Sequence, residues 1–520
     1  MLTAFAWLSL AQVAAIAPVV SNPMPIASLP ATAGAAAPVG RDEIIRSQEV
    51  RPLPGQLDDV PVFNSNSPEV IQQEGILLST FPPDDMVIQD AHLNQAFEGR
   101  FDFFAHHIAR GIRFEDRRTL FIGAVIYNPD TTPVTLDILQ GVSYLSQEAP
   151  FHTLPSVVAN PHGTFFAGPG SRIATDFLQG RHQPQWPEQV TIPPRQAYLL
   201  MNAPIPLRQL PFSVDATLPP GSVLPTIRGG DRSTELASGI PQVRDNRLLP
   251  SNARSMLLHL SSSGPVYAAS LSMYAPQTIN GQERAPTIQE WLSLLVNGDL
   301  AGPRDIPPTD PDTFRKNNQD ERFFYGRVAG VAQGSQWTAQ ATDEVGGSKL
   351  TIPETGNSIS YVISTVDHNT FGTEQIQSAP MLVRYPDTAY RAHGNYGVHY
   401  KVSLPLYNDT NEHQQVALKL QTPLQDETLN SGLRFRRHPH DRIFFRGTVR
   451  LSYETGLGIR RSRYVHLVQH QGQEGEPMLR LLVPPGSHRP VEVEFIYPPD
   501  ATPPHVLTVT TLNTPNLARP

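Results

Sequence analysis

The chain has 520 residues, with 40 Lys and Arg against 48 Asp and Glu, a net charge of −8, and no cysteine. This length allows two or three domains, because single hydrophobic cores rarely grow beyond roughly 250 residues. The acidic balance, without a sustained basic run, argues against nucleic acid as a partner. The lack of cysteine excludes disulfides, thiol nucleophiles and cysteine-ligated metal sites.

The N-terminal segment is apolar and uncharged. No charge occurs from Leu2 to Val20, and Ala-Ile-Ala at 15–17 resembles the small-x-small pattern that precedes a signal-peptidase cut. We therefore expect residues 1–20 to be a signal peptide or, if uncleaved, a membrane anchor, since about 18 apolar residues can just span a bilayer. The Ala- and Pro-rich stretch that follows predicts a linker over 21–59.

From about Val60 onward the pattern is one of short strands. Charged residues make up 17% of the chain against a usual value near 25%, and there are 52 prolines, about twice the average share. Runs of β-branched and aromatic residues are broken by Pro, Gly, Asn and Asp, as from Thr119 to Tyr127 before the turn at 128–130. This pattern of short apolar runs separated by turn residues predicts a mainly β protein built from antiparallel sheets.

One short helix is expected near 287–297. Its apolar residues recur at i, i+3, i+4, i+7 and i+8, and they are Ile288, Trp291, Leu292, Leu295 and Val296. The next segment, 301–322, contains four prolines and has the composition of a linker. We place a domain boundary there, between a first domain at 60–300 and a second at 323–520.

The two halves contain a weak internal sequence repeat. A strand at 120–127, the turn NPDTTP and a second strand at 134–139 are followed in the other half by 398–407, the turn NDTNEH and 415–420. Strand, Asn-containing turn and strand thus recur in the same order. The repetition predicts two immunoglobulin-like antiparallel β-sandwich domains.

Catalytic signatures are missing from the sequence. There is no nucleophile elbow, no H-E-x-x-H, no P-loop and no dinucleotide fingerprint, so no catalytic residue is assigned and no cofactor is expected. A hydrolase acting on envelope polysaccharide would need two carboxyls that meet only in the fold. Asp387 and Asp441 are candidates for its proton donor and base.

The densest polar and aromatic segment runs from Arg384 to Tyr400. Tyrosine rings offer flat apolar faces to sugars, and the polar side chains between them can pair with hydroxyls. The alternative is an internally bonded loop whose tyrosine hydroxyls satisfy backbone groups. The candidate ligand-binding residues are Arg384, Tyr385, Asp387, Tyr390, His393, Asn395, Tyr396 and Tyr400.

Histidines supply a candidate metal site, because neutral imidazole is a common metal ligand. His438 and His440 share one side of an extended segment, and His466 and His470 could share a face of the next strand. Two such pairs on neighbouring strands would form a site. The alternative is solvated polar surface, since the nearby Arg436, Arg437 and Arg442 would repel a divalent cation.

Four segments carry a resemblance to a known family. They are FYGRVAGVAQGSQW (324–337), SAPMLVRYPDTAYRAHGNYGVHY (378–400), FFRGTVRLSY (444–453) and VEVEFIYPPDATPPHVLTVTT (491–511). Through them the chain resembles an exported cyanobacterial family that is catalogued only as a domain of unknown function. The resemblance covers most of the chain from about residue 50 and implies an envelope or extracellular setting. It implies no activity, cofactor or catalytic residue.

These observations favour a non-enzymatic exported cell-envelope protein, either structural or binding glycan or protein ligands through its sandwich loops. A polysaccharide-acting hydrolase and a metal- or solute-binding periplasmic protein are the alternatives. The expected location is the periplasm, the outer envelope or the extracellular space, and the expected partner is an envelope glycan or protein. Membrane contact is expected only through residues 1–20, if they are uncleaved.

Overall fold

The computed structural model describes residues 42–208, 217–224, 249–314 and 322–513, apart from 428, 430 and 456. Residues 1–20, where a signal peptide or anchor is expected, lie outside this part of the chain. The described residues form 27 strands and two α-helices, which confirms a mainly β protein. No helix among them is long and apolar enough to cross a membrane.

The first half is organised around a 12-stranded sheet. Its strands are β4 (Pro61–Ser65), β5 (Val70–Ile71), β6 (Gly75–Ser79), β7 (Phe97–Arg110), β8 (Thr119–Tyr127), β9 (Val134–Leu145), β11 (Gln189–Ile192), β12 (Ala197–Pro206), β13 (Ser251–Tyr274), β14 (Ala329–Gln333), β18 (Ala379–Arg384) and β19 (Arg391–Ala392). The start of β13 pairs with β7 and β9, and its end pairs with β6 and β8. The register shifts between Ser262 and Val266, around Gly264-Pro265, which join the two parts of this long strand.

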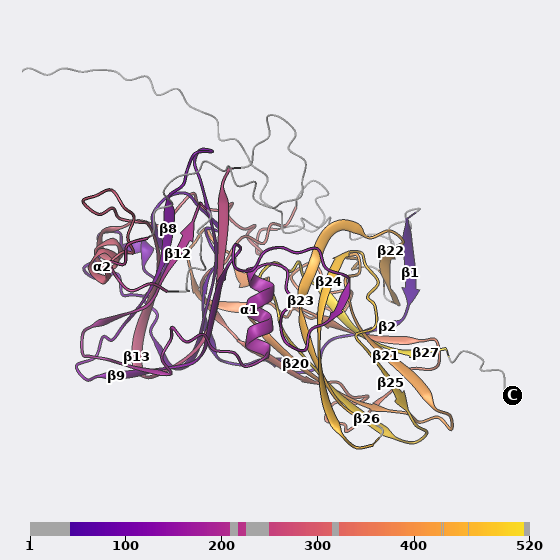
Figure 1. Ribbon diagram of the computed structural model, residues 1–520. Helices are drawn as coiled ribbons and strands as arrows, with labels where there is room; N and C mark the ends of the chain where they lie inside the picture. The colour runs from indigo at the N-terminus through magenta and orange to yellow at the C-terminus, as the bar shows by residue number, and fades with distance from the viewer. Residues whose placement is uncertain are drawn as a thin grey trace, which may run out of the picture.

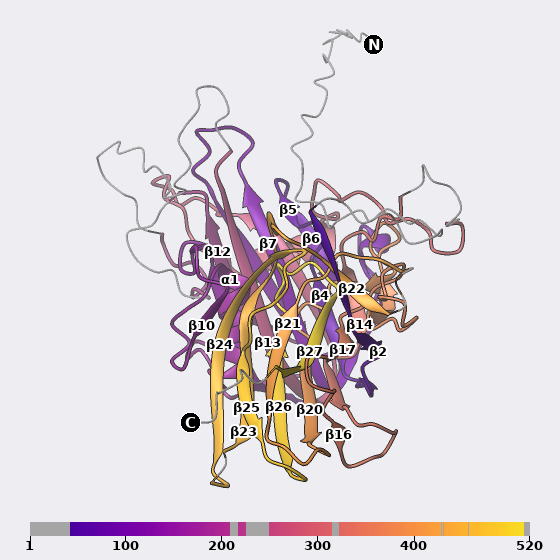
Figure 2. The same ribbon diagram turned by 90° about the vertical axis from the view of Figure 1, so that its right-hand side faces the viewer.

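The second half packs two further sheets around one apolar core. Its eight-stranded sheet contains β3 (Gln56–Leu57), β10 (Val157–Ala159), β15 (Gln336–Gln340), β16 (Leu350–Thr351), β20 (His399–Tyr407), β23 (His440–Glu454), β24 (Arg460–Gln471) and β26 (His488–Ile496). Its five-stranded sheet contains β2 (Glu49–Arg51), β17 (Ser358–Ile363), β21 (Gln414–Gln421), β25 (Leu479–Val483) and β27 (His505–Leu512). A ribbon of β1 (Glu43–Ser47) and β22 (Gly432–Arg436) lies beside them. Figure 2 shows β24, β23, β26 and β20 side by side.

The expectation of purely antiparallel sheets is wrong, because the sheets are mixed. Parallel pairing joins β4 and β5 to β7, β15 and β16 to β20, and β2 to β17. A parallel pair needs a long crossover instead of a tight hairpin, and alternating hydrophobicity does not reveal such crossovers. An immunoglobulin-like topology for each half stays a prediction.

Strands are exchanged between the halves across the linker expected at 301–322. β14 and β18, which follow that linker, extend the first sheet beside β4. Conversely, two strands from the segment expected to be a linker pair with strands of the second half. β2 pairs with β17, and β3 pairs with β15. The chain therefore folds from residue 42 onward, earlier than Val60, and Leu53 is already part of the second core.

Helix α2 (Ile288–Asn297) confirms the helix expected near 287–297. Thr287 caps it, with its side chain accepting from the Glu290 N–H and the Glu290 side chain accepting from the Thr287 N–H. Trp291 is fully buried against β8, where a side chain at Gly123 would lie 2.6 Å from the indole. A single turn of 3-10 helix, η1 (Gln89–Ala91), follows β6.

A second helix, α1 (Pro169–Leu178), was not predicted and lies between the two halves (Figure 1). It contacts β9 and β13 of the first half and β23 and β26 of the second. Thr175 Oγ1 lies 2.7 Å from Thr448 Oγ1, and the Tyr144 hydroxyl donates to Asp176 at 2.6 Å. A third apolar cluster, with Phe104, Ile173 and Ile496, continues this packing, so part of the contact between the halves is apolar.

Candidate functional site

A cavity of about 550 Å³ opens between the two halves, next to the start of α1. The first half contributes Glu69 and His106, and the segment before α1 contributes Phe151. Tyr396 and Arg327 line the part where the halves meet. The second half supplies two groups of lining residues, namely Asp441, Arg442, Ile443 and Arg446 on β23, and Pro499, Asp500, Ala501 and Thr502 after β26.

The start of β23 is irregular where it borders the cavity. Its register with β24 shifts between His440 and Ile443 and again between Ile443 and Phe445. Successive side chains of a regular strand point to opposite faces, yet Asp441, Arg442 and Ile443 all line the cavity. Three consecutive residues of this irregular segment therefore border the cavity, and β-bulges are common beside binding sites.

One wall of the cavity combines an ion pair with an aromatic ring. Arg446 pairs with Asp500, and its guanidinium lies 4.4 Å from the ring centroid of Phe151. Phe151 is 53% exposed, a large value for a phenylalanine. Gly168, with φ of 94°, allows this arrangement, because a Cβ there would lie 2.2 Å from the ring.

The lining also holds a second ion pair and a neutral imidazole. Glu69 pairs with Arg327, and burial raises the pKa of Glu69 in spite of that arginine. His106 Nδ1 lies 2.6 Å from Ser255 Oγ, and burial lowers the pKa of His106 to about 3. The Tyr396 hydroxyl donates to the Ala501 carbonyl at 3.1 Å, and burial raises the pKa of Tyr396 to about 12.

The formal charges of the cavity lining cancel, because it contains three acidic residues and three arginines. The acidic residues are Glu69, Asp441 and Asp500, and the arginines are Arg327, Arg442 and Arg446. Two aromatic rings and several apolar side chains complete the lining. A concave, partly apolar space with a few fixed polar groups is the usual form of a small-ligand site, and such pockets measure roughly 300–1,000 Å³. This arrangement can stack a flat ligand face and hydrogen-bond its edges.

The polar and aromatic segment from Arg384 to Tyr400 is largely bonded to itself and to the core. Arg384 donates to the carbonyls of Tyr385, Pro386 and Thr388 and stacks 3.8 Å from the Tyr390 ring centroid. Asp387 accepts two hydrogen bonds from Arg304, which lower the pKa of that carboxyl. These contacts match the alternative of an internally bonded loop.

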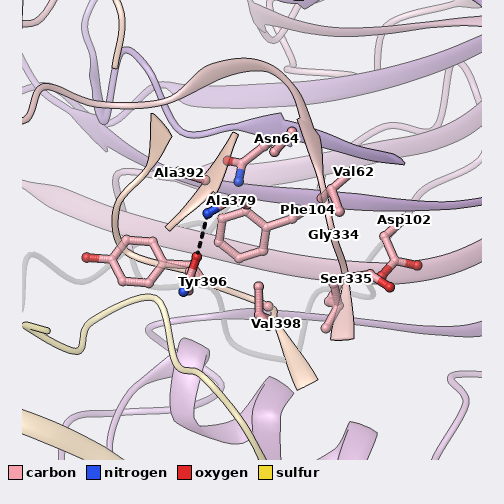
Figure 3. Close-up of a pocket in the computed structure, with 14 residues that line it drawn as sticks. Val62, Asn64, Asp102, Phe104, Gly334, Ser335, Ala379, Ala392, Tyr396 and Val398 are labelled. Atoms are coloured by element: carbon pink, nitrogen blue, oxygen red, sulfur yellow. Dashed lines mark hydrogen bonds between the residues drawn. The ribbon is translucent and has the colours of Figure 1, made fainter. Parts of the chain in front are cut away.

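Three more of the expected ligand residues are buried. The Tyr385 hydroxyl donates to the Ala91 carbonyl at 2.8 Å, and the Tyr400 hydroxyl donates to Gln377 at 3.1 Å. Asn395 accepts from the Ala379 N–H at 3.1 Å, the dashed line in Figure 3.

Tyr396, drawn beside Phe104 in Figure 3, lines the 550 Å³ cavity, whereas Asn395 and His393 border spaces of about 10 Å³. Such a space holds about one water.

The four candidate metal ligands are not brought together. His438 is exposed and lies 2.7 Å from Asp42, and His440 accepts the Arg442 N–H at 3.2 Å. His470 lies 3.0 Å from the Asp441 carbonyl, and His466 is buried 2.8 Å from Ser171 on α1. Within the described ranges no group of three or more His, Asp or Glu side chains could hold a metal ion.

Sequence reasoning missed most of the cavity residues, because Phe151, Glu69 and Asp500 stand alone in the sequence. A signal was nevertheless present. Each of the four segments that carry the family resemblance contributes to the cavity, and the contributed residues are Arg327, Tyr396, Arg446 and the four residues 499–502. Four separate segments of the sequence therefore meet at one place.

The fold and cavity define a mainly β protein of two interlocked halves with a ligand-sized space between them. Over residues 48–511 the chain matches the family described as protein of unknown function (DUF3370), and it belongs to that family. No curated protein matches it.

Three solved structures are similar only at a TM-score of 0.09. A mutant oxalate decarboxylase from Bacillus subtilis is 8% identical, over 84% of this chain and 78% of that chain. The coconut allergen cocosin is 8% identical, over 85% and 86%. Lac15 from a marine microbial metagenome is 10% identical, over 80% and 90%. At this TM-score none of them supports a fold or a function for this chain.

Proposed function

We propose that this protein is a non-enzymatic binding protein of the cell envelope that holds a glycan or peptide ligand in the cavity between its halves. The observation that supports this function is the 550 Å³ cavity itself, with Phe151 and Tyr396 as ring surfaces and three arginines and three carboxylates around them. Aromatic rings and planar charged groups are what bind sugar rings, hydroxyls and peptide groups.

The cavity is preformed, which favours binding over a purely structural role. Its walls belong to both halves, and these are locked together by α1, by the exchanged strands and by a shared apolar cluster. A rigid site avoids the ordering cost that a flexible loop would add to each binding event. The ligand would bridge the two halves without having to assemble them.

Export is part of this proposal and rests on the sequence. The uncharged segment from Leu2 to Val20 and the lack of cysteine suit a secreted protein. The cyanobacterial setting rests on the resemblance of the four segments. Cell fractionation with N-terminal sequencing of the mature protein tests both export and the cleavage site, and an intact protein in the cytoplasm would contradict this part.

The binding function is tested with Phe151→Ala. We expect the purified protein to bind one or more fractions of a panel of envelope polysaccharides and peptidoglycan fragments. The variant should bind about tenfold more weakly or worse, because the exposed ring is lost from the cavity wall.

The matched control is Tyr390→Ala, which removes an aromatic side chain stacked on Arg384 outside the cavity. It should bind as the unaltered protein does. Equal loss in both variants would place the site elsewhere, and unaltered binding by Phe151→Ala would remove the cavity from consideration.

A polysaccharide hydrolase is the second candidate, because the cavity brings together three carboxyls and the pKa of Glu69 is raised by burial. Two carboxyls that flank the scissile bond are the arrangement that glycosidases use. The expected acid Asp387 does not take part, since it is paired with Arg304 and does not line the cavity. Release of reducing ends from a bound glycan, abolished by Glu69→Gln, would favour this candidate over simple binding.

A further inference from the structure

We propose that the cavity selects a short oligosaccharide that carries no acidic groups. This inference rests on the proposed binding function and narrows it from glycans and peptides in general to sugars without acidic groups. It follows from three features of the lining: paired charges, an exposed carboxylate and an exposed aromatic ring.

The positive charges of two cavity arginines are already neutralised by partners within the protein. Arg327 pairs with Glu69, and Arg446 pairs with Asp500. All four side chains are less than one fifth exposed, so their pairs are shielded from salt and water. An anionic ligand would have to compete with these carboxylates and would lose its own hydration on entry.

Asp441 supplies an exposed carboxylate to the lining. Asp500 Oδ2 accepts a hydrogen bond from Arg446, and Asp500 Oδ1 is buried. Asp441 is exposed at the cavity and forms no ion pair within the described ranges. Hydroxyl groups can donate to the Asp441 carboxylate without adding charge, whereas a further carboxylate would be repelled by it.

The aromatic ring of Phe151 provides the third feature. Arg446 lies against it, and more than half of the residue stays exposed at the cavity. The apolar face of a sugar ring can stack on such a surface while its equatorial hydroxyls reach the charged groups around it. The volume of about 550 Å³ suits a ligand of a few sugar rings and is too small for a long folded peptide.

Calorimetric titration of the full chain with trisaccharides tests the inference. The neutral probes are the trimers of glucose, mannose, galactose and N-acetylglucosamine, and the acidic probe is the trimer of galacturonic acid. Galactose and galacturonic acid differ only at C6, where the acid carries a carboxylate, so trimers of the two with the same linkage isolate the effect of the acidic group. We expect at least one neutral trimer to bind at least tenfold more tightly than the galacturonic acid trimer.

The variant Asp500→Asn tests the electrostatic reason. It leaves Arg446 without its carboxylate and the cavity with one more positive charge, so affinity for the galacturonic acid trimer should rise relative to the neutral trimer by about tenfold. Asp387→Asn is the matched control, because it also breaks an Asp–Arg pair but outside the cavity, and it should leave the ratio unchanged. Thermal unfolding of both variants verifies that they remain folded.

The outcomes separate the two proposals. Tighter binding of the galacturonic acid trimer, no binding of any neutral trimer, or an unchanged ratio in Asp500→Asn would overturn the selectivity against acidic sugars. If binding to envelope fractions still depended on Phe151 in those cases, the proposed binding function would stand without it. Neutral-trimer binding that survives Phe151→Ala would overturn both.

Discussion

The hydroxyl of Tyr385 serves two buried backbone groups at once. It donates to the Ala91 carbonyl at 2.8 Å and accepts from the Ser79 N–H at 3.0 Å. The side chain is completely buried, and burial raises the pKa of its phenol well above the ordinary value. Tyr385, which the sequence suggested as a ligand contact, instead connects the end of β18 to β6 and η1.

Tyr385→Phe should destabilise the protein by about 1–3 kcal/mol, because a buried N–H and a buried carbonyl lose their partner. Denaturant unfolding measures this change. Tyr390→Phe is the control, expected to stay within about 0.5 kcal/mol, since its hydroxyl has no such role and the ring is partly exposed. Equal stability of the two variants would show that water replaces the Tyr385 hydroxyl.

At the scale of elements, α1 sits where the halves and the cavity meet. Nine of its ten residues are buried, and its first turn packs against Pro499, which also lines the cavity. Ile173, Ala174, Phe177 and Leu178 recur at helical spacing, so a signal for this helix was present in the sequence. His466, a candidate metal ligand, instead fastens the helix to β24 through Ser171.

The sign of the stability change caused by Gly170→Ala tests how α1 is packed. Helix propensity alone predicts stabilisation by about 0.5–1 kcal/mol. A Cβ at this position would, however, lie 2.2 Å from Pro499 Cγ, so we expect destabilisation by about 1–3 kcal/mol and altered ligand binding. A rise in melting temperature would contradict the packing of α1 against the 499–502 segment.

At the scale of the whole molecule, strand exchange makes the two halves a single cooperative structure. β14 and β18 complete the first sheet, and β2 and β3 complete sheets of the second half. Neither half can form its full sheet without the other. We therefore expect one thermal transition by calorimetry, and two resolved transitions would contradict this coupling.

The pH dependence of stability should be governed by buried histidines. Burial lowers the pKa of eight of them, namely His92, His106, His107, His259, His393, His399, His466 and His505. The unfolded state binds their protons more tightly, so each contributes stability that is lost as pH falls from about 6.5 toward its folded pKa, by up to about 1.4 kcal/mol per pH unit.

Asp102 has the opposite effect on the pH dependence, because burial raises its pKa to about 7. Its contribution to the stability of the folded state is lost as pH rises from about 4 to 7. The histidines outnumber it, and we expect the melting temperature to fall between pH 7 and pH 5. Replacement of the exposed His413 by Asn should leave this profile unchanged. A melting temperature that rises on acidification would show that the carboxyls dominate.

The sequence by itself determined the mainly β composition and helix α2, because alternation, helical period and the Thr287–Glu290 capping box are local signals. It also identified, through the four family segments, stretches that reach the cavity. Tertiary structure alone decided the mixed sheets, the exchanged strands, the place of α1 and the cavity. Glu69, Phe151 and Asp500 lie far apart in the chain, and only long-range strand pairing and packing bring them to one cavity.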